Sequence, residues 1–95
     1  MRISYTKEYL TDYIENNLIG ILWAEFREAQ RQLKIAIGSK HYREKDIWFA
    51  VHERMALHFA NDRLERTQAL LKTISNSNAL NPIVLDTEEI QLLRL

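Results

Sequence analysis

The chain has 95 residues, of which 46% are apolar and 27% are charged, and its thirteen basic and thirteen acidic residues cancel. These values predict one small globular domain with a hydrophobic core and argue against intrinsic disorder. A net charge of zero excludes recruitment to nucleic acid or to an anionic membrane by overall charge alone. The absence of cysteine excludes a disulfide framework, a thiolate nucleophile and a thiolate metal site.

Two glycines and one proline favour long, uninterrupted helices over a β protein with many turns. The N-terminal sequence MRISYTKEYL lacks the apolar core of a signal peptide, and no apolar run approaches the thickness of a bilayer. The absence of cysteine fits a reducing compartment. We therefore expect a soluble, cytoplasmic protein without a membrane-spanning segment.

The first predicted helix covers about residues 5–37. Its apolar residues recur in steps of three and four, which places them on one helical face. Ser4 or Thr6 can cap its start, and Gly38 is expected to end it in the left-handed conformation, before a short turn at 39–42. The apolar face consists of Leu10, Ile14, Leu18, Ile21 or Leu22, Phe26, Ala29, Leu33, and Ala36 or Ile37.

The second predicted helix covers about residues 43–75 and ends before the sequence SNSN, whose residues prefer caps and turns. Two rows of residues repeat every seven positions, as in the seam of a coiled coil. The first row is Ala50, Leu57, Leu64 and Leu71, and the second is Glu53, Ala60, Thr67 and Ile74. The N-terminal half of this helix is also apolar on the opposite side, through Ile47, Trp48, Val51, Met55 and Phe59.

Together the two helices predict an all-α fold, a long antiparallel helical hairpin. A helix that is apolar on two sides needs two neighbours, and a hairpin supplies only one. Either the C-terminal tail or another chain must therefore cover the second side. Because dimers are the commonest assemblies, we expect a homodimer in which two hairpins form a four-helix bundle.

The C-terminal tail carries the sequence of a capping box, since Asp86 is followed three residues later by Glu89. It predicts a short third helix over about 87–94 that packs on the hairpin, so that residues 1–95 form a single all-helical domain. An alternative remains open, in which residues 2–5 and 83–85 pair as a two-stranded ribbon.

The three histidines lie in one stretch, HYREKDIWFAVHERMALHF, but they do not form a recognisable metal motif. His52 and His58 are six residues apart, which separates them by about 120° around a helix. The zinc-protease pattern needs a spacing of four to bring both rings to one metal. One set, His58, Asp62 and Glu65, shares a face and could hold a divalent cation if a second helix added ligands. We interpret it as a solvated strip and expect no metal.

Catalytic chemistry has little support in the sequence. No glycine-rich loop is present for a nucleotide or a dinucleotide, and no serine or threonine lies beside a histidine in a known motif. Glu15, Glu25 and Glu53 could approach one another across the hairpin, but no pattern requires it. We therefore expect a non-enzymatic protein without a cofactor or catalytic residues.

One face of the first helix combines aromatic and basic side chains away from the apolar stripe, within about 80° of the helical wheel. Tyrosine, tryptophan and arginine are enriched at the energetic centres of protein interfaces. Gly20 lies on this face, where a glycine costs about 1 kcal/mol relative to alanine and would permit a close backbone approach. The face, called here the aromatic–basic band, is the predicted partner-binding site and consists of Tyr5, Tyr9, Tyr13, Trp23, Arg27, Arg31 and Lys34. Alternatively, its tyrosines pack beneath the C-terminal tail.

Positive charge is concentrated at the turn of the hairpin, where two acids, Glu28 and Glu44, accompany six bases: Arg27, Arg31, Lys34, Lys40, Arg43 and Lys45. Such a cluster could contact a nucleic-acid backbone, although no nucleic-acid-binding motif is present. We therefore expect a small regulatory protein that binds or masks a protein partner through a helical face. The alternative is a nucleic-acid-associated regulator that uses this basic end.

Overall fold

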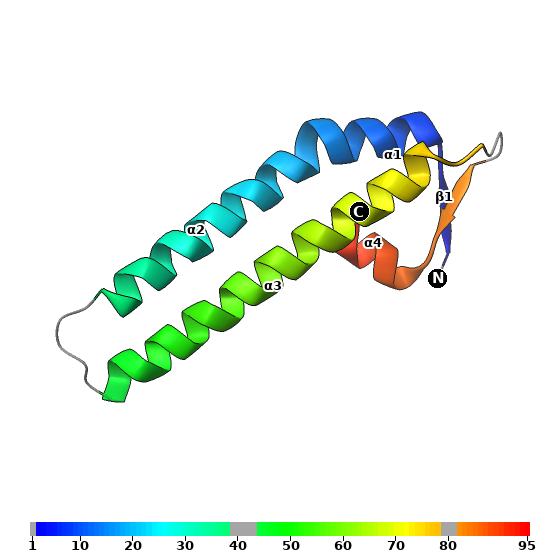
Figure 1. Cartoon of the computed structure of the whole chain (residues 1–95). Coiled ribbons are helices and arrows are strands. Elements are labelled where there is room, and N and C mark those ends of the chain that lie inside the picture. The colour runs from blue at the N-terminus through cyan, green and yellow to red at the C-terminus, as the bar shows by residue number, and fades with distance from the viewer. Residues whose placement is uncertain (1, 39–43, 79–81) are drawn as a thin grey trace.

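A computed structural model describes residues 2–38, 44–78 and 82–95 of the chain. Two long helices run antiparallel, and a two-stranded ribbon and a short C-terminal helix lie at the end opposite residues 38 and 44 (Figure 1). The molecule is elongated, with extents of 58 × 25 × 17 Å. The predicted all-α hairpin with a short C-terminal helix is confirmed.

The first helix is a continuous run of three segments, α1 (Lys7–Tyr13), a π-helical turn η1 (Ile14–Leu18) and α2 (Ile19–Ile37). Thr6 caps it, since its Oγ1 accepts a hydrogen bond of 3.2 Å from the backbone N–H of Tyr9. The predicted start at residue 5 was wrong. Tyr5 belongs instead to strand β1 (Ile3–Tyr5), where its backbone pairs with Ile83, as in the alternative that the sequence left open.

The π-helical turn explains how four residues at successive spacings of four are all buried. In an α-helix each step of four residues overshoots a full turn by about 40°, so that such a row drifts around the axis. In η1 the N–H of Ile19 bonds to the carbonyl of Ile14, and the wider turn offsets this drift. Leu10, Ile14, Leu18 and Leu22 consequently all face the core.

Gly38 ends α2 without the predicted left-handed conformation. Its φ and ψ are −77° and −2°, and its N–H donates to the carbonyl oxygen of Lys34 at 2.9 Å. Gly38 thus continues the last turn of the helix, so this position does not require a left-handed residue. The predicted turn at 39–42 lies outside the described residues.

The second long helix, α3 (Glu44–Ser75), packs its seven-residue seam against the first helix. Leu64, Thr67 and Ile74 are buried, whereas Leu57 and Glu53 are half-buried. The side chains of the seam become more enclosed from the turn toward the C-terminal end of α3. The seam predicted from the sequence is therefore the packed face of this helix.

The two-stranded ribbon, left open by the sequence, is present. Strand β1 pairs antiparallel with β2 (Ile83–Leu85), with Ile3 opposite Leu85 and Tyr5 opposite Ile83. Directly after β2, helix α4 (Thr87–Leu93) begins with the predicted capping box: the N–H of Glu89 donates to Asp86 Oδ1 at 2.8 Å, and the N–H of Asp86 donates to Glu89 Oε1 at 3.2 Å. Arg94, with φ of 58°, ends α4 in the left-handed region.

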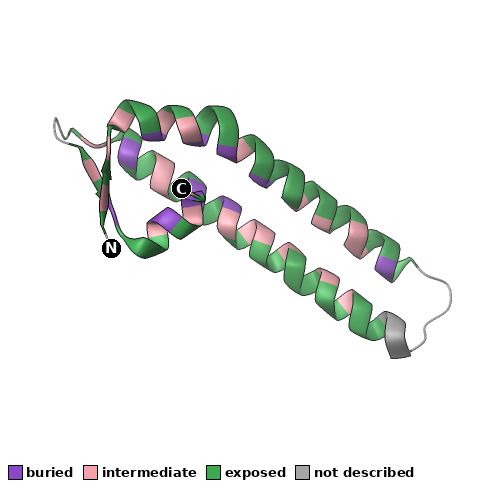
Figure 2. Ribbon diagram, turned by 180° about the vertical axis from the view of Figure 1, so that it is seen from behind, coloured by how far each residue is buried: buried purple, intermediate pink, exposed green. Residues whose placement is uncertain are grey.

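The hydrophobic core lies at the end of the hairpin that carries the ribbon and α4 (Figure 2). Its buried members are Leu10, Ile14, Leu18, Leu22, Leu64, Ile74, Leu85, Ile90 and Leu93. We call residues 23–37 of α2 and 47–63 of α3 the distal half of the hairpin. Among its described side chains only Ala36 is buried. A third layer therefore supports one half of the hairpin and leaves the other half as two helices alone.

Candidate functional site

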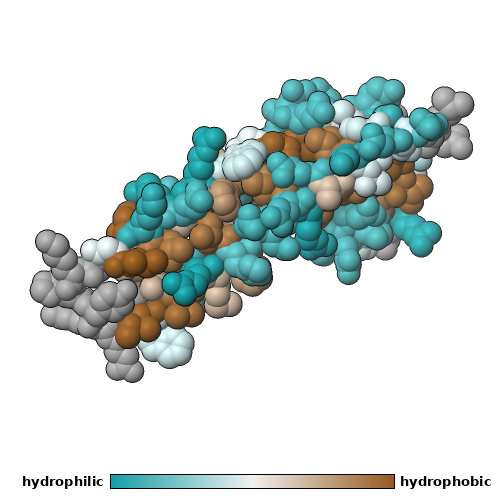
Figure 3. All heavy atoms as spheres, viewed as in Figure 1, coloured by the Kyte–Doolittle hydropathy of each residue, from teal (hydrophilic) through white to brown (hydrophobic). Residues whose placement is uncertain are grey.

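The distal half exposes most of the large apolar side chains that the structure leaves in solvent. Of the twelve such residues in the described chain, nine lie there. Figure 3 shows apolar surface on this half of the molecule and a second apolar group toward the end that carries the ribbon. So many exposed apolar side chains on one half of a small protein are typical of a contact site. The nine residues are Trp23, Ile35, Ile37, Ile47, Trp48, Phe49, Val51, Met55 and Phe59.

The three tyrosines of the aromatic–basic band form a stack along the start of the first helix. The rings of Tyr5 and Tyr9 are 5.6 Å apart, and those of Tyr9 and Tyr13 are 6.3 Å apart, nearly parallel in both pairs. Tyr13 also donates its hydroxyl to the carbonyl oxygen of Leu93 at 2.7 Å. Tyr5 and Tyr13 are half-buried against the core, whereas Tyr9 is 50% exposed. Tyr5 and Tyr13 therefore also contribute to the stability of the fold.

Trp23 and the three basic residues of the band lie on α2. The Trp23 ring is 38% exposed and meets Phe26 edge to face, with centroids 5.9 Å apart. Arg31 binds Glu28 through two hydrogen bonds, of 2.6 and 3.0 Å. Hydrogen bonds from Arg31 and then from Gln32 lower the pKa of Glu28 to about 2.

Arg27 and Lys34 are exposed and have no ion-pair partner in the part of the chain that the structure describes. They are thus the two cations of the band that are available to a partner, because the Arg31 charge is already matched. Lys40 and Arg43 of the basic end lie outside the described residues, as does the side chain of Lys45.

His52 and His58 are exposed on α3, and His41 lies outside the described residues. The His58 ring meets Phe59 at 6.0 Å. Its two proposed neighbours have other partners: Asp62 pairs with Arg66 at 3.9 Å, and Glu65 accepts a hydrogen bond of 3.4 Å from Asn61. No three histidine or carboxylate side chains of the described residues come close enough together to hold a metal.

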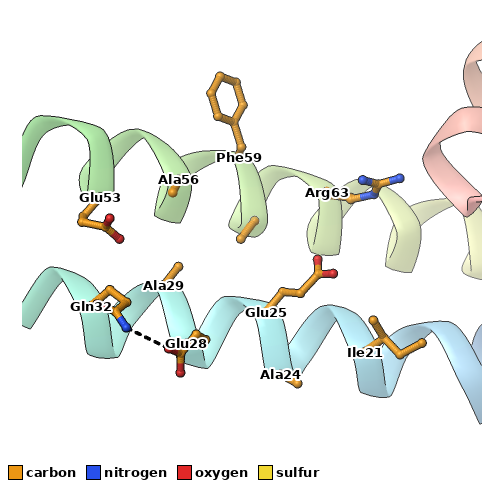
Figure 4. Close-up of a pocket in the computed structure, with 11 residues that line it drawn as sticks. Ile21, Ala24, Glu25, Glu28, Ala29, Gln32, Glu53, Ala56, Phe59 and Arg63 are labelled. Carbon is orange, nitrogen blue, oxygen red and sulfur yellow. Dashed lines mark hydrogen bonds between the residues drawn. The ribbon is translucent and has the colours of Figure 1, made fainter. Parts of the chain in front are cut away.

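A groove of about 720 Å³ runs between α2 and α3 on one face of the distal half (Figure 4). Ala29, Ala56 and Ala60 line it with small side chains. Glu53 points from α3 toward Gln32 on α2 (Figure 4). This carboxylate is half-buried, and it has no hydrogen-bond or ion-pair partner among the described residues. The sequence pattern revealed Glu53 as an irregularity in the seam, but not the groove that accommodates it.

The C-terminal end of α4 closes the groove at the side of the core. Arg94 forms an ion pair with Glu25 of α2 at 2.7 Å, and this hydrogen bond is the main reason that the pKa of Glu25 is lowered. Arg63 of α3 donates to the carbonyl oxygens of Gln91 at 2.8 Å and Leu92 at 3.2 Å. Partial burial lowers the pKa of the Arg63 guanidinium. One short helix therefore bridges both long helices.

The outer side of α3 carries an apolar row that neither α2 nor α4 covers. We call it the α3 stripe, and it consists of Trp48, Val51, Met55 and Phe59, all exposed. A hollow of about 350 Å³ opens on this stripe, lined by Val51, Met55, Phe59, Arg54 and His58. Sequence periodicity located the stripe, but the hollow depends on side-chain positions.

Comparison with known proteins gives no relative: no family model, no curated protein and no solved structure matches the chain. None of the helices in the described residues combines the length and apolar character needed to cross a bilayer.

Proposed function

We propose that this protein is a small, non-enzymatic regulator that binds a protein partner through a helical face and acts as a homodimer in the cytoplasm. The observation that carries the proposal is the distal half, where nine large apolar side chains are exposed and only Ala36 is buried; Trp23 of the aromatic–basic band is one of the nine, and those on α3 offer surface to a second copy. Leaving such surface in water is unfavourable by about 25 cal/mol per Å². A binding partner that removes this surface from solvent supplies a reason for its presence.

The partner protein binds to the aromatic–basic band on the outer face of the first helix. Tyr9 and Trp23 provide apolar ring area with polar tips, and Arg27 and Lys34 provide unmatched positive charge. This combination is typical of the centre and the rim of a protein interface. These four side chains are exposed, so the hairpin can bind a partner through them without unfolding.

The experiment that tests this function compares proteins retained from an extract of the native host by three immobilised forms: wild type, Tyr9→Ala/Trp23→Ala and Val84→Ala. Val84 is exposed on β2, does not belong to the band, and serves as the control. We expect a protein that is retained by wild type and by Val84→Ala but is lost with the band variant. Circular dichroism melts establish that all three forms are folded. Equal retention by all three forms would refute the band as the binding site.

A further inference from the structure

We propose that the α3 stripe is a two-fold interface between two copies of this chain, in which Trp48 of each copy occupies the hollow lined by Val51, Met55 and Phe59 of the other. The inference rests on the proposed homodimer and assigns its contact surface and orientation. The stripe is separate from the aromatic–basic band, which lies on the first helix, so a dimer leaves the band free.

The first support is the area that the stripe offers. Trp48 and Phe59 are each 63% exposed. Because an aromatic side chain carries roughly 150–250 Å², these two alone expose roughly 200–300 Å². A stable interface buries about 800 Å² from each partner, so the two rings supply about a quarter to a third of it. Val51 and Met55 extend the apolar centre, and Arg54 and His58 beside them form a polar rim.

The second support is the order of the side chains along the stripe. An aromatic residue lies at each end, Trp48 and Phe59, and two aliphatic residues, Val51 and Met55, lie between them. A second α3 laid antiparallel with its centre near residues 53 and 54 places Trp48 against Phe59 of the other copy, and Val51 against Met55. The hollow between Met55 and Phe59 receives the indole, where Arg54 can lie against its face.

The position of α4 selects the antiparallel orientation. Residues of α3 and α4 line a common hollow beside the end of the stripe: Phe59, Asp62, Arg63, Arg66, Glu88, Gln91 and Leu92. In a parallel pair, the two α4 helices would meet at the same level and compete for the space next to Phe59. In an antiparallel pair they lie at opposite ends, and each stripe extends toward the α4 helix of the other copy.

The test is sedimentation equilibrium between about 1 and 500 µM, a range that spans micromolar dissociation constants. We expect wild type to approach twice the chain mass of 11.3 kDa. Met55→Asp should raise the dissociation constant at least about 30-fold, as for a central interface residue. Ile35→Asp is the matched control, because Ile35 is exposed to 55% on α2, close to the 51% of Met55. It should leave the dissociation constant unchanged.

Orientation is measured on a variant with one spin label. The chain has no cysteine, so Lys72→Cys, at an exposed position of α3, supplies the only thiol. Two labels in the antiparallel dimer are separated by roughly 55 Å along the helix axis, whereas a parallel dimer brings them within about 20 Å. A short distance would overturn the antiparallel arrangement.

The outcomes separate this inference from the proposed function. A wild-type dimer that Met55→Asp and Ile35→Asp weaken equally would overturn the α3 stripe as the interface but leave the homodimer intact. A monomer across the whole concentration range would overturn both the stripe and the homodimer. Neither result bears on partner binding by the aromatic–basic band, which the retention experiment tests independently.

Discussion

At the scale of single residues, Gly20 is exposed in the middle of the first helix, and no contact within the described chain requires a glycine at this position. Its φ is not positive, and a methyl group built at its Cα meets no other part of the described chain within 4 Å. Glycine in a helix interior costs about 1 kcal/mol relative to alanine. The position lies within the aromatic–basic band, so the structure leaves room there for a partner's backbone.

We therefore predict that Gly20→Ala raises the free energy of unfolding by about 1 kcal/mol, measured by urea denaturation. Ala24→Gly, at an exposed position one turn later, is the reverse control and should lower it by a similar amount. If a partner approaches the helix at Gly20, the stabilised variant binds that partner more weakly. A loss of stability in Gly20→Ala would contradict the open surroundings of this residue.

Thr67 is a second residue whose chemistry conflicts with its position. Its side chain is fully buried in the seam, and its hydroxyl has no hydrogen-bond partner among the described residues. A buried polar group without a partner costs about 1–3 kcal/mol. Thr67→Val retains the branched shape and removes that cost.

We expect Thr67→Val to stabilise the protein by about 1 kcal/mol in the same denaturation experiment. Thr73→Val is the matched control on α3, because the Thr73 hydroxyl is exposed and bonds to the carbonyl oxygen of Ala69 at 3.1 Å. That variant should give no gain. Equal effects of the two substitutions would show that the gain does not come from removing a buried, unpaired hydroxyl.

At the scale of elements, α4 has only seven residues and depends on anchors to the long helices. Tyr13 bonds to the carbonyl oxygen of Leu93, Arg63 bonds to two carbonyl oxygens near the end of α4, and Arg94 pairs with Glu25. Basic and hydroxyl groups thereby satisfy carbonyls that the end of a helix leaves unpaired. These contacts fix α4 across the hairpin and define where the third layer stops.

The Glu25–Arg94 pair predicts a specific dependence on pH. The pKa of Glu25 is lowered from its ordinary value of 4.5, so the native state favours the charged carboxylate. Its stabilisation is present above pH 4.5 and is lost as the pH falls through the lowered pKa. Because both side chains are about a third or more exposed, the pair contributes at most about 1 kcal/mol.

Glu25→Gln should therefore be less stable than wild type at pH 7, by under about 1 kcal/mol, and the difference should shrink below pH 4.5. Thermal melts at several pH values measure this difference. Arg94→Gln should give the same loss at pH 7, and the double variant should lose less than the sum of the two. A difference that persists unchanged at low pH would exclude the ion pair as its cause.

At the scale of the whole molecule, the ribbon and α4 pack against only one half of the hairpin. The ribbon, α4 and the core occupy one half (Figure 2), and nine of the twelve exposed large apolar side chains of the described residues occupy the other. In the proposed assembly a second copy covers α3 and a partner protein covers the outer face of α2. Net charge contributes little to either contact, since the chain as a whole is neutral.

The neutral net charge and the proposed protein contacts predict weak binding to nucleic acid. A protein that neutralises several phosphates loses affinity steeply with salt. We expect little retention on heparin or duplex DNA at about 150 mM salt, a concentration at which exposed charges are screened beyond about 8 Å. Salt-dependent DNA binding that Arg27→Glu/Arg31→Glu abolishes would favour the alternative function at the basic end.

The sequence by itself determined the features that depend on neighbours in the chain. Periodicity predicted the two long helices and most of their packed faces, Asp86 marked the start of α4, Thr6 was one of two candidate caps, and the seven-residue rows identified the seam. Each of these follows from contacts between residues about one helical turn apart or from the repeat of a regular helix. The aromatic–basic band was also predicted from helical geometry, but Tyr5 lies on β1, and the π-helical turn separates the tyrosines from Trp23 and the basic residues.

Only the tertiary structure decided features that join distant parts of the chain. The pairing of Tyr5 with Ile83 and the bond from Tyr13 to Leu93 connect residues about eighty positions apart. The choice of Leu22 over Ile21 for the core, and the π-helical turn before it, depend on what packs against the first helix. The groove between α2 and α3 and the hollow on the α3 stripe likewise depend on how side chains are placed in space. Non-local packing sets these positions, and a local pattern carries no information about which distant surface will meet it.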